Sequence, residues 1–351
     1  MRGTGVISTR FSSTNRSLTF VLVGIVVLMS ILSPRRFLAV GNVISMGYQL
    51  PIIAFLSIGM MITMLSGGIN LAIVATANFT GITTALLLKA LAGTATAEAG
   101  VGVVLVAMGG GLAAALIVGA AMGWLIAYVK VPDILATLGA MTLLNGVNVV
   151  ITKGYTLSDF PPFLLAIGNG TVARVPIALF VLLGVCLWLA VILSRSVFGM
   201  SLYLIGSNPI AARFSNIKVR SVVVREYILS AFFSALTAFI MLGQFNSVNP
   251  DYAQSYLLVS VLACFLGGID PFGGTGRLSG MLLAVVILQV VSTGVGLLRM
   301  NSYLIQAMWG FIIIVLIAAN HFDARLRERS RLREALRRHS KADGAQPLNH
   351  E

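Results

Sequence analysis

Apolar runs of the length needed to cross a lipid bilayer recur along the whole chain, and they constrain its fold more than any other feature. A transmembrane helix needs about 20 consecutive, predominantly apolar residues. Charged residues make up 10% of the sequence and hydrophobic residues 58%, whereas soluble domains carry about 25% charge. The sequence therefore predicts an all-α polytopic membrane protein. Ten transmembrane helices are expected, at roughly 18–33, 42–65, 69–89, 100–129, 134–152, 175–194, 226–245, 255–269, 278–298 and 303–320.

Basic residues gather on one side of this pattern. An even number of spans places both termini on the same side of the membrane, and 18 of the 24 Lys and Arg residues then lie on that side. By the positive-inside rule this side is the cytoplasm. We therefore expect a cytoplasmic segment at 1–17, a transmembrane domain at 18–320 with a cytoplasmic loop at 195–225, and a basic cytoplasmic tail at 321–351.

The net charge of +13 does not indicate nucleic-acid binding, because the basic residues lie mainly in the tail and in the loops between spans, as membrane orientation requires. Eight basic residues lie in the tail, where leucines recur among the arginines, a pattern typical of a helix on anionic lipid. The first apolar run follows three arginines, as in a signal peptide, but Ser33–Arg36 then replaces a small-residue cleavage motif. This run is therefore expected to remain as a span.

Groups that carry catalytic or ion-coupling chemistry are expected outside the membrane core. Each of the eleven carboxylates lies in a predicted loop, at a predicted helix end or in the tail, and the three histidines lie at or beyond the last span. Ion-coupled carriers and intramembrane enzymes need such groups at depth. Cys186 and Cys264 lie in separate apolar runs, so neither a disulfide nor a metal site is predicted. Because no Gly-Lys dipeptide occurs, no phosphate-binding loop is expected, and energy for uphill transport would come from another chain.

The loop at 195–225 contains the signature of a short helix. The side chain of Asn208 is suited to cap a helix, and Pro209 follows at the first turn, where a missing backbone N–H costs nothing. The loop also carries five basic residues. A short basic helix at the membrane face is suited to dock into a groove on a soluble partner. The alternative is a solvated connector.

Four segments, in order along the chain, are similar to segments of one protein family. They are LSGGINL at 65–71, VPDILATLG at 131–139, GSNPIAARFSNI at 206–217 and LGGIDPFGGTG at 266–276. Over roughly residues 40–320 the chain resembles the permease subunits of bacterial ATP-binding-cassette (ABC) sugar importers, of the ribose, xylose, arabinose and autoinducer-2 type. Two positions depart from the family pattern: Asn70 stands where the family has aspartate, and Asn216 where it has glycine.

The resemblance implies an assembly in the bacterial inner membrane. Its expected partners are a second permease subunit, a cytoplasmic ATPase that binds ATP and Mg, and an extracytoplasmic solute-binding protein. This chain itself would carry no cofactor. The departure at Asn70 also fits an asymmetric pair of permeases, so homodimer and heterodimer both stay open. The resemblance and the basic helix together predict an ATPase-coupling contact at Asn208, Pro209, Ala211, Ala212, Arg213, Ser215 and Ile217.

Uncharged polar residues inside the spans are the candidates for the translocation path. We select Asn70, Asn145, Asn148 and Gln244, of which Asn145 and Asn148 share one helix face at i,i+3 spacing. For each, an interhelical hydrogen bond is the competing interpretation. A neutral polar lining suits an uncharged, hydroxylated solute better than an ion.

The sequence therefore predicts a permease subunit that forms the path for a monosaccharide or similar solute, driven by a separate ATPase. Three alternatives stay open: the permease of an amino-acid or nucleoside ABC importer, a secondary transporter, and a membrane enzyme. For a membrane enzyme, the sequence offers no group of side chains that could form a catalytic site.

Overall fold

A computed structural model of the chain describes residues 5–93, 96–298, 300–301, 304–312 and 314. Residues 1–305 form one compact unit and 306–351 a second. In the second unit the described residues, 306–312 and 314, are helical. All elements discussed below belong to the first unit.

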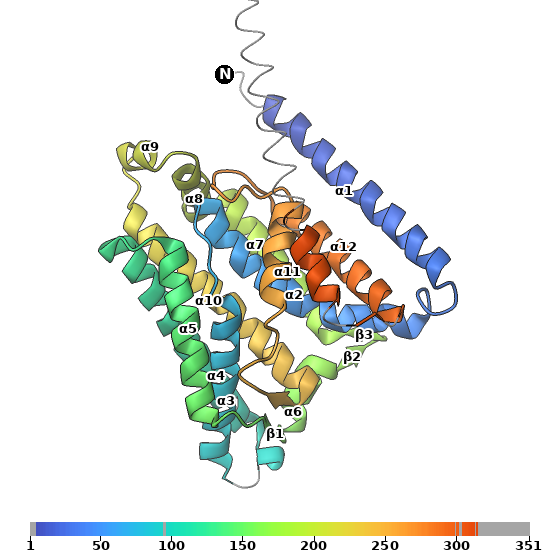
Figure 1. The fold of residues 1–351 in the computed structure, drawn as a ribbon. Helices are drawn as coiled ribbons and strands as arrows, with labels where there is room; N and C mark the ends of the chain where they lie inside the picture. Colours follow the sequence, from blue (N-terminus) through green and yellow to red (C-terminus); the bar gives the residue numbers. More distant parts are fainter. Residues whose placement is uncertain (1–4, 94–95, 299, 302–303, 313, 315–351) are drawn as a thin grey trace, which may run out of the picture. The chain divides into compact units, whose positions relative to one another are not determined.

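The first unit is a bundle of helices with two very short antiparallel strand pairs (Figure 1). Strand β1 (Leu157–Ser158) pairs antiparallel with β4 (Ser247–Val248), and β2 (Thr171–Val172) pairs with β3 (Val175–Pro176). The helices are α1 (Gly5–Leu32), α2 (Val40–Ser66), α3 (Ile73–Ala92), the short η1 (Thr96–Glu98), α4 (Val101–Trp124) with its π-helical extension η2 (Leu125–Val129), α5 (Asp133–Thr152), α6 (Pro162–Asn169), α7 (Ile177–Arg195), α8 (Val197–Ser207), α9 (Pro209–Phe214), α10 (Val219–Phe245), α11 (Tyr256–Leu266) and α12 (Leu278–Leu297).

Eight helices among the described residues are long and apolar enough to cross a membrane. They correspond to eight of the ten predicted spans. The second and third predicted spans are indeed separate helices, and residues 67–72 connect them. The expected span at 255–269 is wrong as a full crossing, because α11 has 11 residues. At 1.5 Å per residue it covers about 16 Å of a hydrocarbon core about 30 Å thick. The expected span at 303–320 and the tail at 321–351 lie partly or wholly outside the described residues.

Helix α10 begins seven residues before its predicted start at 226. The first two turns carry Arg220 and Arg225, whose charge hides them from a hydropathy pattern although arginine is a good helix former. Arg220 lies over the ring of Tyr128, with its guanidinium carbon 5.4 Å from the ring centroid. This extension places Glu226 inside the helix, where it is 1% exposed. The expectation that every carboxylate lies in a loop, at a helix end or in the tail is therefore wrong. Helix α1 likewise begins at Gly5, well before the predicted span at 18–33.

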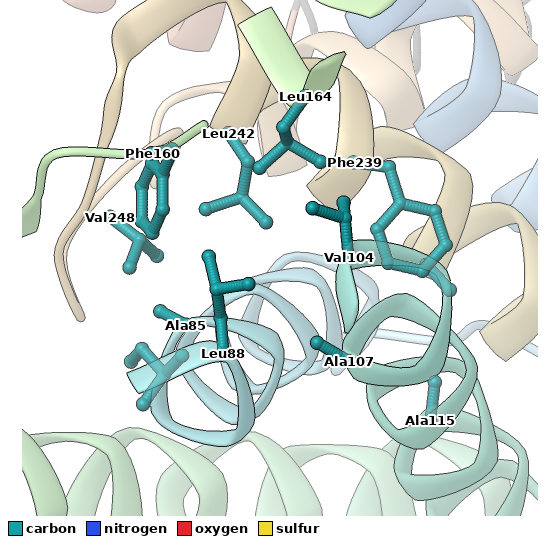
Figure 2. Close-up of a cluster of buried hydrophobic side chains, with 12 residues drawn as sticks. Ala85, Leu88, Val104, Ala107, Ala115, Phe160, Leu164, Phe239, Leu242 and Val248 are labelled. Carbon is teal, nitrogen blue, oxygen red and sulfur yellow. The ribbon is translucent and has the colours of Figure 1, made fainter. Parts of the chain in front are cut away.

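Small residues let α4 approach α10 closely, as expected for helix packing in lipid. A Cβ atom on Gly119 would lie 2.6 Å from the carbonyl oxygen of Tyr227, and one on Gly123 would lie 2.7 Å from the Cα of Val224. Further along the same helices, Figure 2 shows apolar side chains of α3, α4, α6 and α10 in one cluster, with Phe160, which lies just before α6, at its edge. Helix α10 is thus the axis against which α2, α3, α4 and α6 pack.

Candidate functional site

Helix α9 forms as its sequence predicts. The Oδ1 atom of Asn208 accepts hydrogen bonds from the backbone N–H groups of Ile210 and Ala211, both at 3.0 Å, and Pro209 occupies the first turn. The helix ends at Phe214, and two residues later Asn216 has a φ of +59°, in the left-handed region. Glycine adopts this conformation most readily and asparagine tolerates it better than most residues. The departure from the family's glycine therefore preserves the turn.

The exposed surface of α9 differs from the predicted coupling set. Ala212 is completely buried, and Ala211 and Ile217 are half-buried, so the two alanines pack α9 against the protein. Asn208, Pro209, Arg213 and Ser215 are exposed as expected. The largest exposed apolar side chains are Phe214, at 89%, and Ile210, at 66%. Both were missed by the sequence argument. The sequence could have indicated them, because they are apolar i,i+4 neighbours on one helix face and lie outside every predicted span.

The four family-like segments, which are up to about 200 residues apart, meet at the end of α2. The backbone N–H of Gly274 donates to the carbonyl oxygen of Leu65 at 2.9 Å. A Cβ atom on Gly206, in the last turn of α8, would overlap both of these atoms. A Cβ on Gly67, which has a φ of +97°, would lie 3.0 Å from the carbonyl oxygen of Phe272. Glycine is therefore required where these three backbones touch.

The remaining family-like segment reaches the same place from α5. Thr137 donates through Oγ1 to the carbonyl oxygen of Ile69 at 3.0 Å. The Oδ2 atom of Asp133 lies 2.5 Å from the position of a Cβ on Gly68, and the Tyr227 hydroxyl lies 3.0 Å from it. We call this meeting point the motif junction, defined as residues 65–69, Asp133, Thr137, Gly206 and 272–274.

The motif junction is joined to α10 by buried polar side chains. Ser66 donates through Oγ to Oε1 of Glu226 at 2.8 Å. Within the described residues, Oε2 of Glu226 and the hydroxyl of Tyr227 have no hydrogen-bond partner. Sequence reasoning missed Glu226 because it placed this residue at the first position of α10. The end of α2 therefore contacts α5, α8 and α10.

The four candidate path residues do not form one site. Asn70 donates to Oγ of Ser230 at 2.9 Å, and its Oδ1 accepts the backbone N–H of Ala72 at 3.0 Å. Gln244 donates to the carbonyl oxygen of Tyr48 at 2.6 Å. Ser230 and Gln244 are about 21 Å apart along α10, at 1.5 Å per residue. Asn70 and Gln244 thus hold separate helix contacts.

The pair on α5 also faces a neighbouring helix. Asn148 is completely buried and donates to the carbonyl oxygen of Ala75 in α3 at 3.4 Å. Asn145 is half-buried, and its Oδ1 atom has no hydrogen-bond partner in the described part of the chain. For Asn70 and Gln244 the hydrogen bond to a neighbouring element accounts for the polar side chain. Asn148 uses only its Nδ2 atom in such a bond, and its Oδ1 atom, like that of Asn145, has no hydrogen-bond partner among the described residues.

Comparison with known proteins adds a family assignment to this geometry. Residues 42–319 match the family model described as "Branched-chain amino acid transport system / permease component". The chain is 27% identical over 317 residues to the ribose import permease protein RbsC of Haemophilus influenzae, covering 89% of this chain and 94% of that protein. It is 32% identical over 309 residues to RbsC of Bacillus subtilis, covering 84% and 88%. It is 25% identical over 299 residues to the D-allose transport system permease protein AlsC of Escherichia coli, covering 85% and 89%. No solved structure gives a significant match.

Proposed function

The chain belongs to the branched-chain amino acid transport system / permease component family, and on that premise we propose that it forms the translocation path for a monosaccharide or similar polyhydroxylated solute. Membership makes it a multi-pass inner-membrane permease of an ABC importer, not an enzyme, with a separate ATPase and no cofactor of its own. The sugar class is supported by the relatives that are named as ribose and D-allose permeases.

Helix α9 is the proposed contact with the ATPase, and one observation carries this assignment. It is a capped six-residue helix that exposes Ile210 and Phe214 while Ala212 anchors it to the protein. Exposed aromatic and aliphatic side chains on a rigid element are typical anchors of protein interfaces. Arg213, between them, is also exposed and adds electrostatic attraction to an acidic rim.

Force applied to α9 has a direct route into the bundle. Helix α8 directly precedes α9. Its residue Gly206 touches the end of α2 at Leu65 and the loop before α12. We propose that ATP-driven movement of the ATPase shifts this contact and thereby tilts α2, α5 and α10. Such a shift requires the ATPase to bind α9 differently in its two states. A second permease copy and an extracytoplasmic solute-binding protein would complete the assembly, with the α9 side facing the cytoplasm.

Affinity purification in mild detergent from the native host tests the ATPase contact. Phe214→Ser and Ile210→Ser are expected to lower the amount of co-purified ATPase at least about fivefold each, because each removes an interface anchor. Val172→Ser is the matched control, since Val172 is apolar and 56% exposed but lies in β2, away from α9. The reversal Arg213→Glu should also weaken retention, and more strongly at low salt. Equal retention in all variants, or uptake in vesicles lacking ATP, would overturn the assignment.

The family description gives the second candidate, a permease for a branched-chain amino acid. The two candidates share the coupling helix and differ in the binding protein that delivers the solute. Identifying the solute bound to the co-purified binding protein decides between them. Recovery of leucine, isoleucine or valine would replace the sugar assignment and leave the ATPase contact intact.

A further inference from the structure

A cavity of about 560 Å³ lies where α10 ends and α11 begins. It is lined by residues of one continuous stretch, 245–256, in which the chain leaves α10, forms β4 and enters α11. Small-molecule sites commonly have volumes of about 300–1,000 Å³. Because α9 precedes the first residue of α10 and the cavity follows the last, the two lie at opposite ends of this 27-residue helix.

The irregular backbone around the cavity is fixed by side chains of other elements. Asn78 of α3 donates through Nδ2 to the carbonyl oxygens of Pro250, at 2.7 Å, and Tyr252, at 2.9 Å. On the other side, β4 pairs with β1. Non-helical backbone at membrane depth is tolerated where protein buries it or where it lines a water-filled cavity.

One residue of the cavity wall also has a strained backbone. Ala253 has a φ of +59°, in the left-handed region that residues with a Cβ atom disfavour. It follows directly after Tyr252, whose carbonyl is held by Asn78. Strain of this kind persists only where the surroundings hold it, and it is concentrated at functional sites. The loop that lines the cavity is therefore held in one conformation before any solute binds.

The lining combines aromatic rings with uncharged polar groups. The rings of Phe245 and Tyr252 lie 5.6 Å apart, centroid to centroid, with their planes at 84°. The hydroxyl of Tyr252 lies 2.8 Å from Oγ of Ser247. Aromatic faces carry partial negative charge and attract the C–H groups of a sugar ring. Exposed Gln254 and Asp251 offer hydrogen-bonding atoms to hydroxyl groups beside these rings.

The charges of the lining distinguish between classes of solute. Among the described residues that line the cavity, Asp251 is the one charged residue and none is lysine or arginine. A phosphorylated sugar or the carboxylate of an amino acid would need a basic partner to offset its desolvation. The hydroxyl groups of a neutral sugar need only donors and acceptors, which this lining supplies.

We propose that this cavity binds an uncharged, polyhydroxylated solute at the end of the bundle opposite α9. The inference rests on the proposed transport function, which supplies this class of solute. The site would hold the solute at the mouth of the path, through stacking on Tyr252 and Phe245 and hydrogen bonds to Asp251 and Gln254. It is independent of α9, so the failure of one assignment does not entail the failure of the other.

Saturation-transfer NMR on the full purified chain in detergent tests the site without any partner protein. The probes are D-ribose, D-allose and L-leucine at millimolar concentration. We expect the two sugars to give signals that compete with each other and L-leucine to give none. Phe245→Ala and Tyr252→Ala should weaken sugar binding about five- to tenfold, because each removes an aromatic contact. Tyr155→Ala is the matched control, since Tyr155 is 71% exposed and lies outside the lining.

Three results would overturn the proposal. They are no sugar signal from the wild type, an unchanged signal in both Phe245→Ala and Tyr252→Ala, and leucine binding that is lost in Asp251→Asn. The last would reassign the cavity to an amine-bearing solute. Because Phe245 is 44% exposed, its replacement tests the wall even if Tyr252→Ala disturbs the loop. A negative NMR result together with the expected loss of ATPase from the α9 variants would refute this site alone. Sugar binding together with equal ATPase retention in the wild type and the α9 variants would refute only the coupling contact.

Discussion

Replacing Gly206 by alanine is the sharpest test of the motif junction. The new Cβ would overlap the Gly274 nitrogen and the Leu65 oxygen, which are the donor and acceptor of a 2.9 Å hydrogen bond. Both are backbone atoms, so no flexible side chain can move aside. Leaving such a donor and acceptor unpaired costs about 1–3 kcal/mol, and overpacking adds about 1–3 kcal/mol. The free energy of unfolding should therefore fall by about 2–6 kcal/mol.

Two buried thiols make this change measurable. Cys186 and Cys264 are free and buried, so a thiol-reactive fluorophore reports unfolding as they become accessible. At about 2 °C per kcal/mol for a chain of this size, the midpoint should fall by about 4–12 °C. Gly184→Ala is the matched control, because Gly184 is also helical and has no neighbour within 4 Å of a Cβ position. It should be neutral or slightly stabilising, since alanine favours a helix interior. Equal midpoints for both variants and the wild type would refute the requirement for glycine where the three backbones meet.

Three further perturbations test separate parts of the structure. Asn208→Ala removes the cap of α9, which is worth about 1 kcal/mol, and should weaken ATPase retention about fivefold; Asn208→Ser should restore it, and equal retention in both variants would contradict the cap. Glu226→Gln keeps an acceptor for Ser66 and should unfold within about 1 kcal/mol of the wild type with ATP-dependent uptake intact; lost uptake in a stable variant would instead indicate ion coupling through this carboxyl. Asn78→Ala releases two carbonyls of the cavity loop and should increase chymotrypsin cleavage at Tyr252 about tenfold or more; unchanged protection would show that the loop is held by other contacts.

Local features of the chain account for most of the fold and for the shape of α9. Apolar runs of sufficient length predicted eight of the spans, because a helix that crosses lipid must satisfy its own backbone and present apolar side chains. The cap at Asn208 and the proline after it were readable for the same reason, since both act within one helical turn. Two boundaries were misjudged where local composition conflicts with tertiary context. Arginines hid the first turns of α10, and an apolar run concealed the short length of α11.

The candidate site could be predicted only in part from the sequence. The sequence argument predicted the short capped helix, but for the coupling contact it selected Ala212, which is buried, and passed over Phe214 and Ile210, which are exposed. A pattern of residue types shows which side chains are able to make a contact. It does not show which face of a six-residue helix is covered, because that depends on the neighbours of the helix. The same limit applies to Asn70 and Gln244, whose polar groups are used by Ser230 and the Tyr48 carbonyl.

The sequence alone predicts the membrane class, the order of the helices and the capped helix α9, and it contains no Gly-Lys nucleotide motif. These properties depend on composition and on contacts within a few residues. The meeting of Leu65, Asp133, Gly206 and Gly274, and the burial of Glu226 beside them, are seen only in the folded molecule. Such meetings require glycine-sized gaps between backbones that are up to about 200 residues apart in the chain. No local pattern encodes that spacing, because it is the packing of α2, α8 and the loop before α12 that brings these backbones together.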